Sequence, residues 1–88
     1  MELKWTRGAL QNLDDIASYI AQDHPVRAQS FVRELKQKIE NLRAFQIGQA
    51  GRIFGTKEFV LHKNFIVIYR VKNDQVQVLR IQHCAQNR

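Results

Sequence analysis

The first part of the chain changes from an alternating pattern to a helical one. Leu3 and Trp5 alternate with charged neighbours, which predicts a short strand. Thr6 comes next, and its hydroxyl can accept a hydrogen bond from an unpaired backbone N–H at the start of a helix. Apolar residues then recur every three or four positions, which predicts an amphipathic helix over about residues 7–22. Its apolar face consists of Leu10, Leu13, Ile16, Ala17 and Ile20.

A second helix is predicted directly after the first. Asp23 and His24 interrupt the pattern, and Pro25 suits the first turn of a new helix because its missing N–H would be unpaired there anyway. The apolar spacing then continues to near Phe45. Two helices joined by so short a connection fold back on each other as an antiparallel hairpin. The second apolar stripe consists of Ala28, Phe31, Val32, Leu35, Ile39 and Leu42.

The apolar spacing drops to two after Gln46. A strand is predicted over about residues 57–62, and two more around residues 65–71 and 76–81. The pair Asn73-Asp74 suits a two-residue hairpin between the last two strands, because Asn and Asp tolerate positive φ. We interpret the segment before the first of these strands as a flexible linker, punctuated by Gly48, Gly51 and Gly55.

Both faces of the last two predicted strands are largely apolar. These strands are therefore expected to be central in a sheet, with the helical hairpin covering one face and a bound partner as a candidate for the other. The alternation places Phe65, Val67, Tyr69 and Val71 opposite Ile66, Ile68 and Arg70, and it places Val76, Val78 and Arg80 opposite Leu79 and Ile81.

The predicted fold class is α+β, in the order β-α-α-β-β-β. An N-terminal strand precedes an antiparallel helical hairpin that packs on a small antiparallel sheet, and the first strand can join that sheet after the hairpin crosses over. The 88 residues are 44% hydrophobic and 25% charged, which predicts one folded domain over residues 1–88.

Composition also bears on the cellular location, disulfide bonds and cofactors to be expected. No apolar run approaches the ~18 residues that would span a bilayer, and the N-terminus does not resemble a signal peptide, so we expect a cytoplasmic protein without a membrane partner. Cys84 is the single cysteine, which excludes an internal disulfide and favours a role as a small buried apolar residue. Residues with the spacing of a metal or nucleotide motif are absent, and we expect no cofactor and no metal.

Positive charge gathers in the second half of the sequence. The formal net charge is +6. Residues 1–46 carry seven basic and six acidic side chains, whereas residues 47–88 carry seven basic and two acidic ones. A basic C-terminal half predicts an acidic partner, either nucleic acid or an acidic protein segment. Ordinary charge for solubility is the alternative.

Candidate binding residues lie on or near the late strands. Counting outward from the hairpin places Arg70 opposite Gln77 and diagonal to Arg80, so the two guanidinium groups would repel each other unless an anion lay between them. The alternative is that each points into water. The residues expected to contact a partner or target are Arg52, Lys57, Lys63, Arg70, Arg80, His83 and Arg88.

A catalytic function finds little support in the sequence. His83 could donate a proton near neutral pH, and with Arg80 it would be the candidate for cleaving RNA. A lone histidine at a strand end is more often incidental. We therefore expect no catalytic residues, with His83 and Arg80 as the candidates if the protein is a nuclease.

Five runs of the sequence carry a resemblance to a known family. They are LDDIASYIA (residues 13–21), AQSFV (28–32), GTKEFVLH (55–62), IVIYRV (66–71) and VLRIQH (78–83). Together with the order of elements, they resemble the ParE/RelE superfamily of bacterial toxins from type II toxin–antitoxin modules, and the late runs are similar to its ParE-like branch. Many members carry a proline after the second helix, where this chain has Phe45-Gln46-Ile47-Gly48, so the conformation of this connection stays open.

The resemblance implies a growth-arresting toxin of a plasmid-stabilisation module. Such a toxin is neutralised by an acidic, partly disordered antitoxin, with which it would form a hetero-oligomer. ParE-like members inhibit DNA gyrase without being enzymes, whereas RelE-like members cleave messenger RNA on the ribosome.

The residues favour the gyrase inhibitor over the ribosome-dependent endoribonuclease. RelE-like nucleases usually carry an arginine three positions before the strand tyrosine that matches Tyr69, and here that position is Ile66. They also carry a cation on the preceding strand, where residues 59–61 are apolar, and only His83 partly matches their proton-transfer residue. Losing one phosphate-binding cation costs about two to three powers of ten in rate.

Overall fold

The computed structural model describes residues 1–83, and its elements follow the predicted order with one short strand added. Cys84 and Arg88, each given a role above, lie outside the described residues. Within residues 1–83, no helix is long and apolar enough to cross a membrane. The elements are β1 (Glu2–Trp5), α1 (Arg7–Ala21), α2 (Pro25–Glu40), a 3-10 turn (Asn41–Arg43), β2 (Gln49–Ala50), β3 (Lys57–His62), β4 (Phe65–Lys72) and β5 (Gln75–His83).

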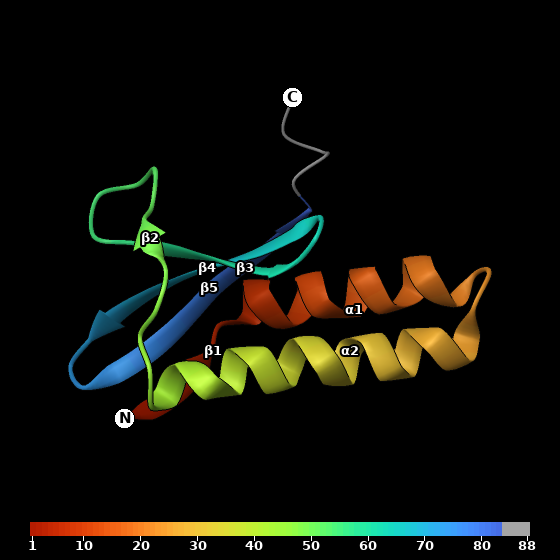
Figure 1. The fold of residues 1–88 in the computed structure, drawn as a ribbon, viewed down its shortest axis with the longest axis horizontal. Coiled ribbons are helices and arrows are strands. Elements are labelled where there is room, and N and C mark those ends of the chain that lie inside the picture. Colours follow the sequence, from red (N-terminus) through yellow and green to blue (C-terminus); the bar gives the residue numbers. More distant parts are fainter. Residues whose placement is uncertain (84–88) are drawn as a thin grey trace.

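The chain forms two layers, with both helices lying along one face of a five-stranded sheet (Figure 1). The strand order is β1-β5-β4-β3-β2. As predicted, β1 joins the sheet after the helical hairpin crosses over, but it pairs with β5 in parallel, so the sheet is mixed rather than purely antiparallel. The added strand β2 pairs only with Lys57 and Glu58, and its two residues are too few to give an alternating pattern.

The hydrophobic core lies between the helices and the sheet. Its largest fully buried side chains include Leu35, Leu61 and Tyr69. Leu10 was predicted to face the core but is 51% exposed, and Ala9 is buried in its place. The first turn of α1 runs beside β5, and a Cβ on Gly8 would be in ordinary van der Waals contact with the Leu79 carbonyl oxygen, at 3.7 Å.

The hairpin between β4 and β5 turns as predicted. Asn73 and Asp74 have φ values of 54° and 56°, the conformation that a tight two-residue hairpin requires. This turn sets the register, with Lys72 opposite Gln75 and Arg70 opposite Gln77.

A β-bulge at Leu79 interrupts that register. Ile68 pairs with Arg80, whereas the next residue of β4, Tyr69, pairs with Val78, so Leu79 is an extra residue on β5. An extra residue reverses the faces of the side chains that follow it. The predicted placement of Arg80 on the face of Val78 is therefore wrong: Arg80 is exposed on the open face of the sheet, and Ile81 is buried in the core.

Thr6 connects this bulge to the start of α1. Its hydroxyl donates to the Val78 carbonyl at 2.7 Å, with the Leu79 carbonyl 3.2 Å away, and accepts from the Ala9 N–H at 3.2 Å. Thr6 is thus the predicted N-cap of α1, and its hydroxyl also bonds the backbone of β5. Asn12 on α1 supports the same strand, because its Oδ1 accepts from the Ile81 N–H at 3.1 Å.

Replacing Thr6 tests this double role. We expect Thr6→Val to lower the free energy of unfolding by about 1–2 kcal/mol, because it removes the side-chain cap of α1 and the hydrogen bond that the hydroxyl donates to β5. Thr6→Ser keeps the hydroxyl and should stay within about 0.5 kcal/mol of the wild type. Urea unfolding followed by circular dichroism measures both, and equal losses would contradict the role of the hydroxyl.

Candidate partner-binding surface

The face of the sheet that the helices leave uncovered has an apolar centre. Ile66, Ile68 and Leu79 are half-buried there and form the floor of a cavity of about 330 Å³. The rest of its lining comes from the segment before β3, from β3 itself and from β5, namely Arg52, Ile53, Thr56, Glu58, Arg80 and Gln82.

The segment between β2 and β3 is a loop held by internal hydrogen bonds, whereas the glycines had suggested a flexible linker. The Gly51 N–H donates to the Thr56 carbonyl at 2.8 Å, and the Thr56 hydroxyl and N–H both donate to the Ile53 carbonyl, at 2.6 and 3.1 Å. The Arg52 N–H donates to the Glu58 carboxylate at 3.2 Å. A Cβ on Gly51 would lie 2.2 Å from the Thr56 hydroxyl oxygen, so only glycine permits this closure.

The connection from α2 to β2 is held by Tyr69 in the middle of β4. Its buried hydroxyl donates to the Ile47 carbonyl, and Lys57 Nζ donates to the Gln46 carbonyl at 3.4 Å. These bonds fix the position of β2 and of the loop that follows it. Burial raises the pKa of the Tyr69 hydroxyl above its ordinary value of 10.0.

The structure brings together only part of the predicted set of cations. Arg52 and Arg80 line the same cavity, and within residues 1–83 neither forms an ion pair. Arg70 lies on the same face farther along β4, where its Nε donates to Gln77 Oε1 at 2.5 Å. Lys57 points to the α2–β2 connection, and Lys63 lies in the turn between β3 and β4.

His83 lies on the other face of the sheet. Its ring packs edge-on against Phe65 at 4.7 Å between centroids, and it lines a separate pocket with Asn12 and Asp15 of α1. Its Nδ1 is buried and has no hydrogen-bond partner among the described residues. The two candidate nuclease residues, Arg80 and His83, are therefore separated by the sheet.

Two surface residues that sequence reasoning missed stand at the tip of the β2–β3 loop. Ile53 is 70% exposed and Phe54 is 102% exposed. The available signal was two large apolar residues between Gly51 and Gly55, a position at which a flexible linker has no use for them.

Comparison with known proteins points to one family. The family profile described as the ParE toxin of the type II toxin–antitoxin system parDE matches residues 3–88. A Sinorhizobium fredii protein named as a toxin, Y4kP, is 35% identical over 86 residues, which cover 96% of this chain and 88% of that protein. The Caulobacter vibrioides toxin RelE2 is 30% identical over 96% of each chain.

Two solved structures of similar fold come from toxin–antitoxin systems. A chain from the chromosomal ParDE system of Pseudomonas aeruginosa superposes with a TM-score of 0.90 at 28% identity, covering 94% of this chain and 95% of that one. A chain of the RelBE2 toxin–antitoxin complex from Mycobacterium tuberculosis shares the fold with a TM-score of 0.61 at 20% identity, covering 93% and 95%.

The anchor on Tyr69 predicts a pH dependence of stability. A tyrosine whose pKa is raised in the folded state stabilises the fold fully below its unfolded pKa near 10, and this stabilisation is lost as the pH rises further. We expect Tyr69→Phe to cost about 1 kcal/mol at neutral pH through the lost hydrogen bond, and to flatten the fall in stability above pH 10. Urea titrations across this range measure it, with the 74%-exposed Tyr19→Phe as control. Parallel pH profiles of wild type and Tyr69→Phe would contradict the assignment.

Proposed function

This chain belongs to the ParE toxin family of type II toxin–antitoxin systems, and from that premise we propose that it arrests growth by inhibiting DNA gyrase. In this proposal the toxin acts by occupying its target protein and cuts no messenger RNA. The residues that would contact the target are those gathered on the open face of the sheet, foremost Arg52 and Arg80.

The observation that carries the proposal is the separation of Arg80 from His83. Cleaving RNA requires a cation at the scissile phosphate and a proton donor or acceptor within hydrogen-bond reach of the same reacting group. Arg80 lines the cavity on the open face, whereas His83 packs against Phe65 on the helix side. Side chains on opposite faces of a sheet cannot meet at one phosphate.

The composition of the open face gives further support. Ile66 and Ile68 of β4 and Leu79 of β5 form an apolar floor. Such a floor excludes water and matches an apolar side chain, whereas it offers a phosphate no hydrogen-bond donor. This surface suits a protein partner better than a nucleic-acid backbone.

A supercoiling assay with purified gyrase tests the proposed target. We expect the wild-type toxin to block supercoiling at micromolar concentration and Arg80→Glu to lose at least about tenfold in potency, because it reverses the charge beside the cavity. His83→Gln, on the other face, should inhibit as the wild type does. Circular dichroism confirms that each variant is folded.

The alternative activity, ribosome-dependent cleavage of messenger RNA, is tested by a separate assay. A ribosome-dependent endoribonuclease would cut translated messages at codon intervals in a translation extract, and His83→Gln would abolish the cuts. Such cuts, together with unchanged supercoiling, would overturn the gyrase proposal.

We propose an acidic antitoxin as the neutralising partner. Related folds occur in solved toxin–antitoxin complexes, and the net charge of +6 favours a negatively charged segment. An extended segment can add to a sheet as an extra strand wherever an edge strand has free backbone groups.

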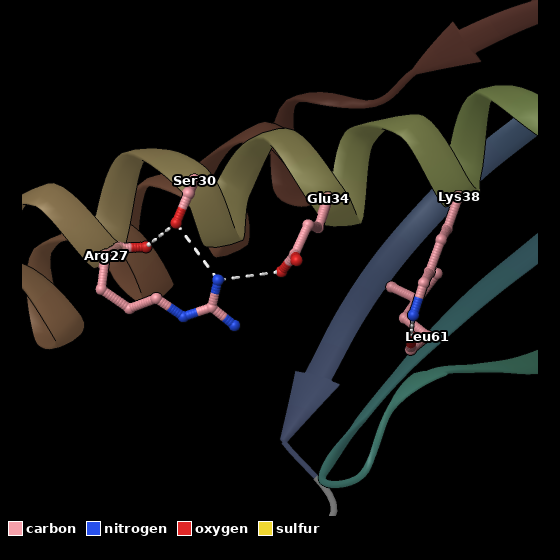
Figure 2. Close-up of polar contacts among 5 residues, drawn as sticks. All are labelled: Arg27, Ser30, Glu34, Lys38 and Leu61. Atoms are coloured by element: carbon pink, nitrogen blue, oxygen red, sulfur yellow. Dashed lines mark hydrogen bonds and ion pairs between the residues drawn. The ribbon is translucent and has the colours of Figure 1, made fainter.

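The two edges of this sheet differ in how their backbone groups are used. On the side of β5 that faces β1, side chains of Thr6 and Asn12 bond the backbone near and past the end of β1. Thr6 bonds the Val78 carbonyl, and Asn12 bonds the Ile81 N–H. Beyond β2, the segment 59–62 of β3 receives one described side-chain bond, from Lys38 Nζ to the Leu61 carbonyl at 2.5 Å (Figure 2). The edge of β3 is therefore the favoured site for an added strand.

Hydrogen exchange can locate the added strand. On binding of the cognate antitoxin, we expect the amides of residues 59–62 to gain protection, because they would acquire backbone partners. The amides of residues 79–83 serve as the internal control and should change little. Protection confined to β5, or to the helices, would contradict addition at β3.

A further inference from the structure

The tip of the loop between β2 and β3 is apolar and exposed to solvent. Phe54 is the most exposed large apolar side chain in the described part of the chain, and Ile53 beside it is 70% exposed. Figure 1 shows this loop, in green, standing clear of both helices, so neither element of the helical layer covers it. Two adjacent exposed apolar residues are typical of an interaction site.

The exposure of this tip comes from an ordered loop. Three hydrogen bonds within Gly51–Thr56 close the loop, and the Glu58 carboxylate holds the Arg52 backbone. The glycine at 55 has a φ of 84°, which lets the chain turn back directly after Phe54. A side chain presented on such a pre-organised loop loses little conformational entropy on binding.

The loop tip is continuous with the cavity on the open face. Ile53 lines that cavity, whose floor is formed by Ile66, Ile68 and Leu79. The volume of about 330 Å³ leaves room for apolar side chains of a partner. Phe54 can then cover the partner's segment from the side of the loop.

Charge defines the partner more closely. Arg52 and Arg80 stand at the wall of the cavity, and within residues 1–83 no carboxylate forms an ion pair with either of them. A partner that places carboxylates beside its apolar side chain would pair with both guanidinium groups. A flat lipid surface could take up Phe54 but would leave the cavity empty, so the shape favours a protein.

We propose that the Gly51–Thr56 loop and the floor formed by Ile66, Ile68 and Leu79 make one docking surface for an acidic, apolar-rich segment of a partner protein. Phe54 and Ile53 are its apolar anchors, and Arg52 and Arg80 pair with its carboxylates. The inference goes beyond the proposed target, because it defines the chemistry of the bound segment and holds even if gyrase is not inhibited.

A peptide titration tests the apolar part of this proposal. The probe is a short, fluorescently labelled peptide of alternating leucine and glutamate, and the comparison peptide carries serine in place of each leucine. We expect the leucine peptide to bind and Phe54→Ser to weaken it by about tenfold or more. Val26→Ser removes an 81%-exposed apolar side chain from α2 and should leave the affinity unchanged.

Amide chemical shifts show where the peptide binds. We expect the changes to concentrate in residues 51–58 and 79–82. Shifts confined to the helices, equal binding of the serine peptide, or equal affinity of Phe54→Ser and Val26→Ser would each overturn the proposal.

The charge and the class of partner are tested separately. Arg80→Gln should weaken the binding of the leucine–glutamate peptide several-fold, whereas Arg33→Gln, at an exposed position of α2, should not. Vesicles of neutral and anionic phospholipid serve as the competing surface. Binding to anionic vesicles that depends on Phe54, without peptide binding, would show that the loop is a lipid anchor and would overturn the proposal.

Discussion

The Thr6 hydroxyl contacts the Val78 and Leu79 carbonyls at the β-bulge, and this bulge sets which residues of β5 reach each surface of the molecule. The extra residue at Leu79 turns Arg80 to the open face and Ile81 to the core. Without the bulge, a charged side chain would enter the core and an isoleucine would leave it, at a cost of several kcal/mol. The same hydroxyl caps α1, so the bulge and the helix are stabilised together.

This arrangement links the fold of the N-terminus to the function of the C-terminal half. Thr6 lies more than seventy positions before the bulge in sequence but bonds it directly. On the neighbouring strand β4, Tyr69 plays a comparable part, because its hydroxyl holds the connection that precedes the β2–β3 loop. The open face is thus assembled from a strand and a loop to whose positions one hydroxyl each contributes.

Much of the fold could be predicted from local patterns, since spacing, Pro25 and Asn73-Asp74 act through the adjacent backbone. The bulge could not be predicted in this way. The apolar positions of β5 shift from 76 and 78 to 79 and 81, but a strand with two apolar faces gives the same pattern, and the residue that bonds the bulge, Thr6, is distant in sequence. The candidate site was predicted only in part for the same reason. Arg52 and Arg80 line the same cavity, but His83 lies on the other face, and the exposed Phe54 stands in a segment that the glycines had suggested to be flexible.

The separation of faces also explains how one fold can serve two kinds of toxin. A fold fixes where side chains project, and the chemistry depends on which side chains are placed there. Introducing an arginine at Ile66 would restore one cation to the open face, but His83 would still lie behind the sheet against Phe65. Conversion to a nuclease would therefore require a new proton-transfer group on the face of Arg80. The apolar floor and the exposed Phe54 match the proposed binding of another protein better than they match the cleavage of RNA.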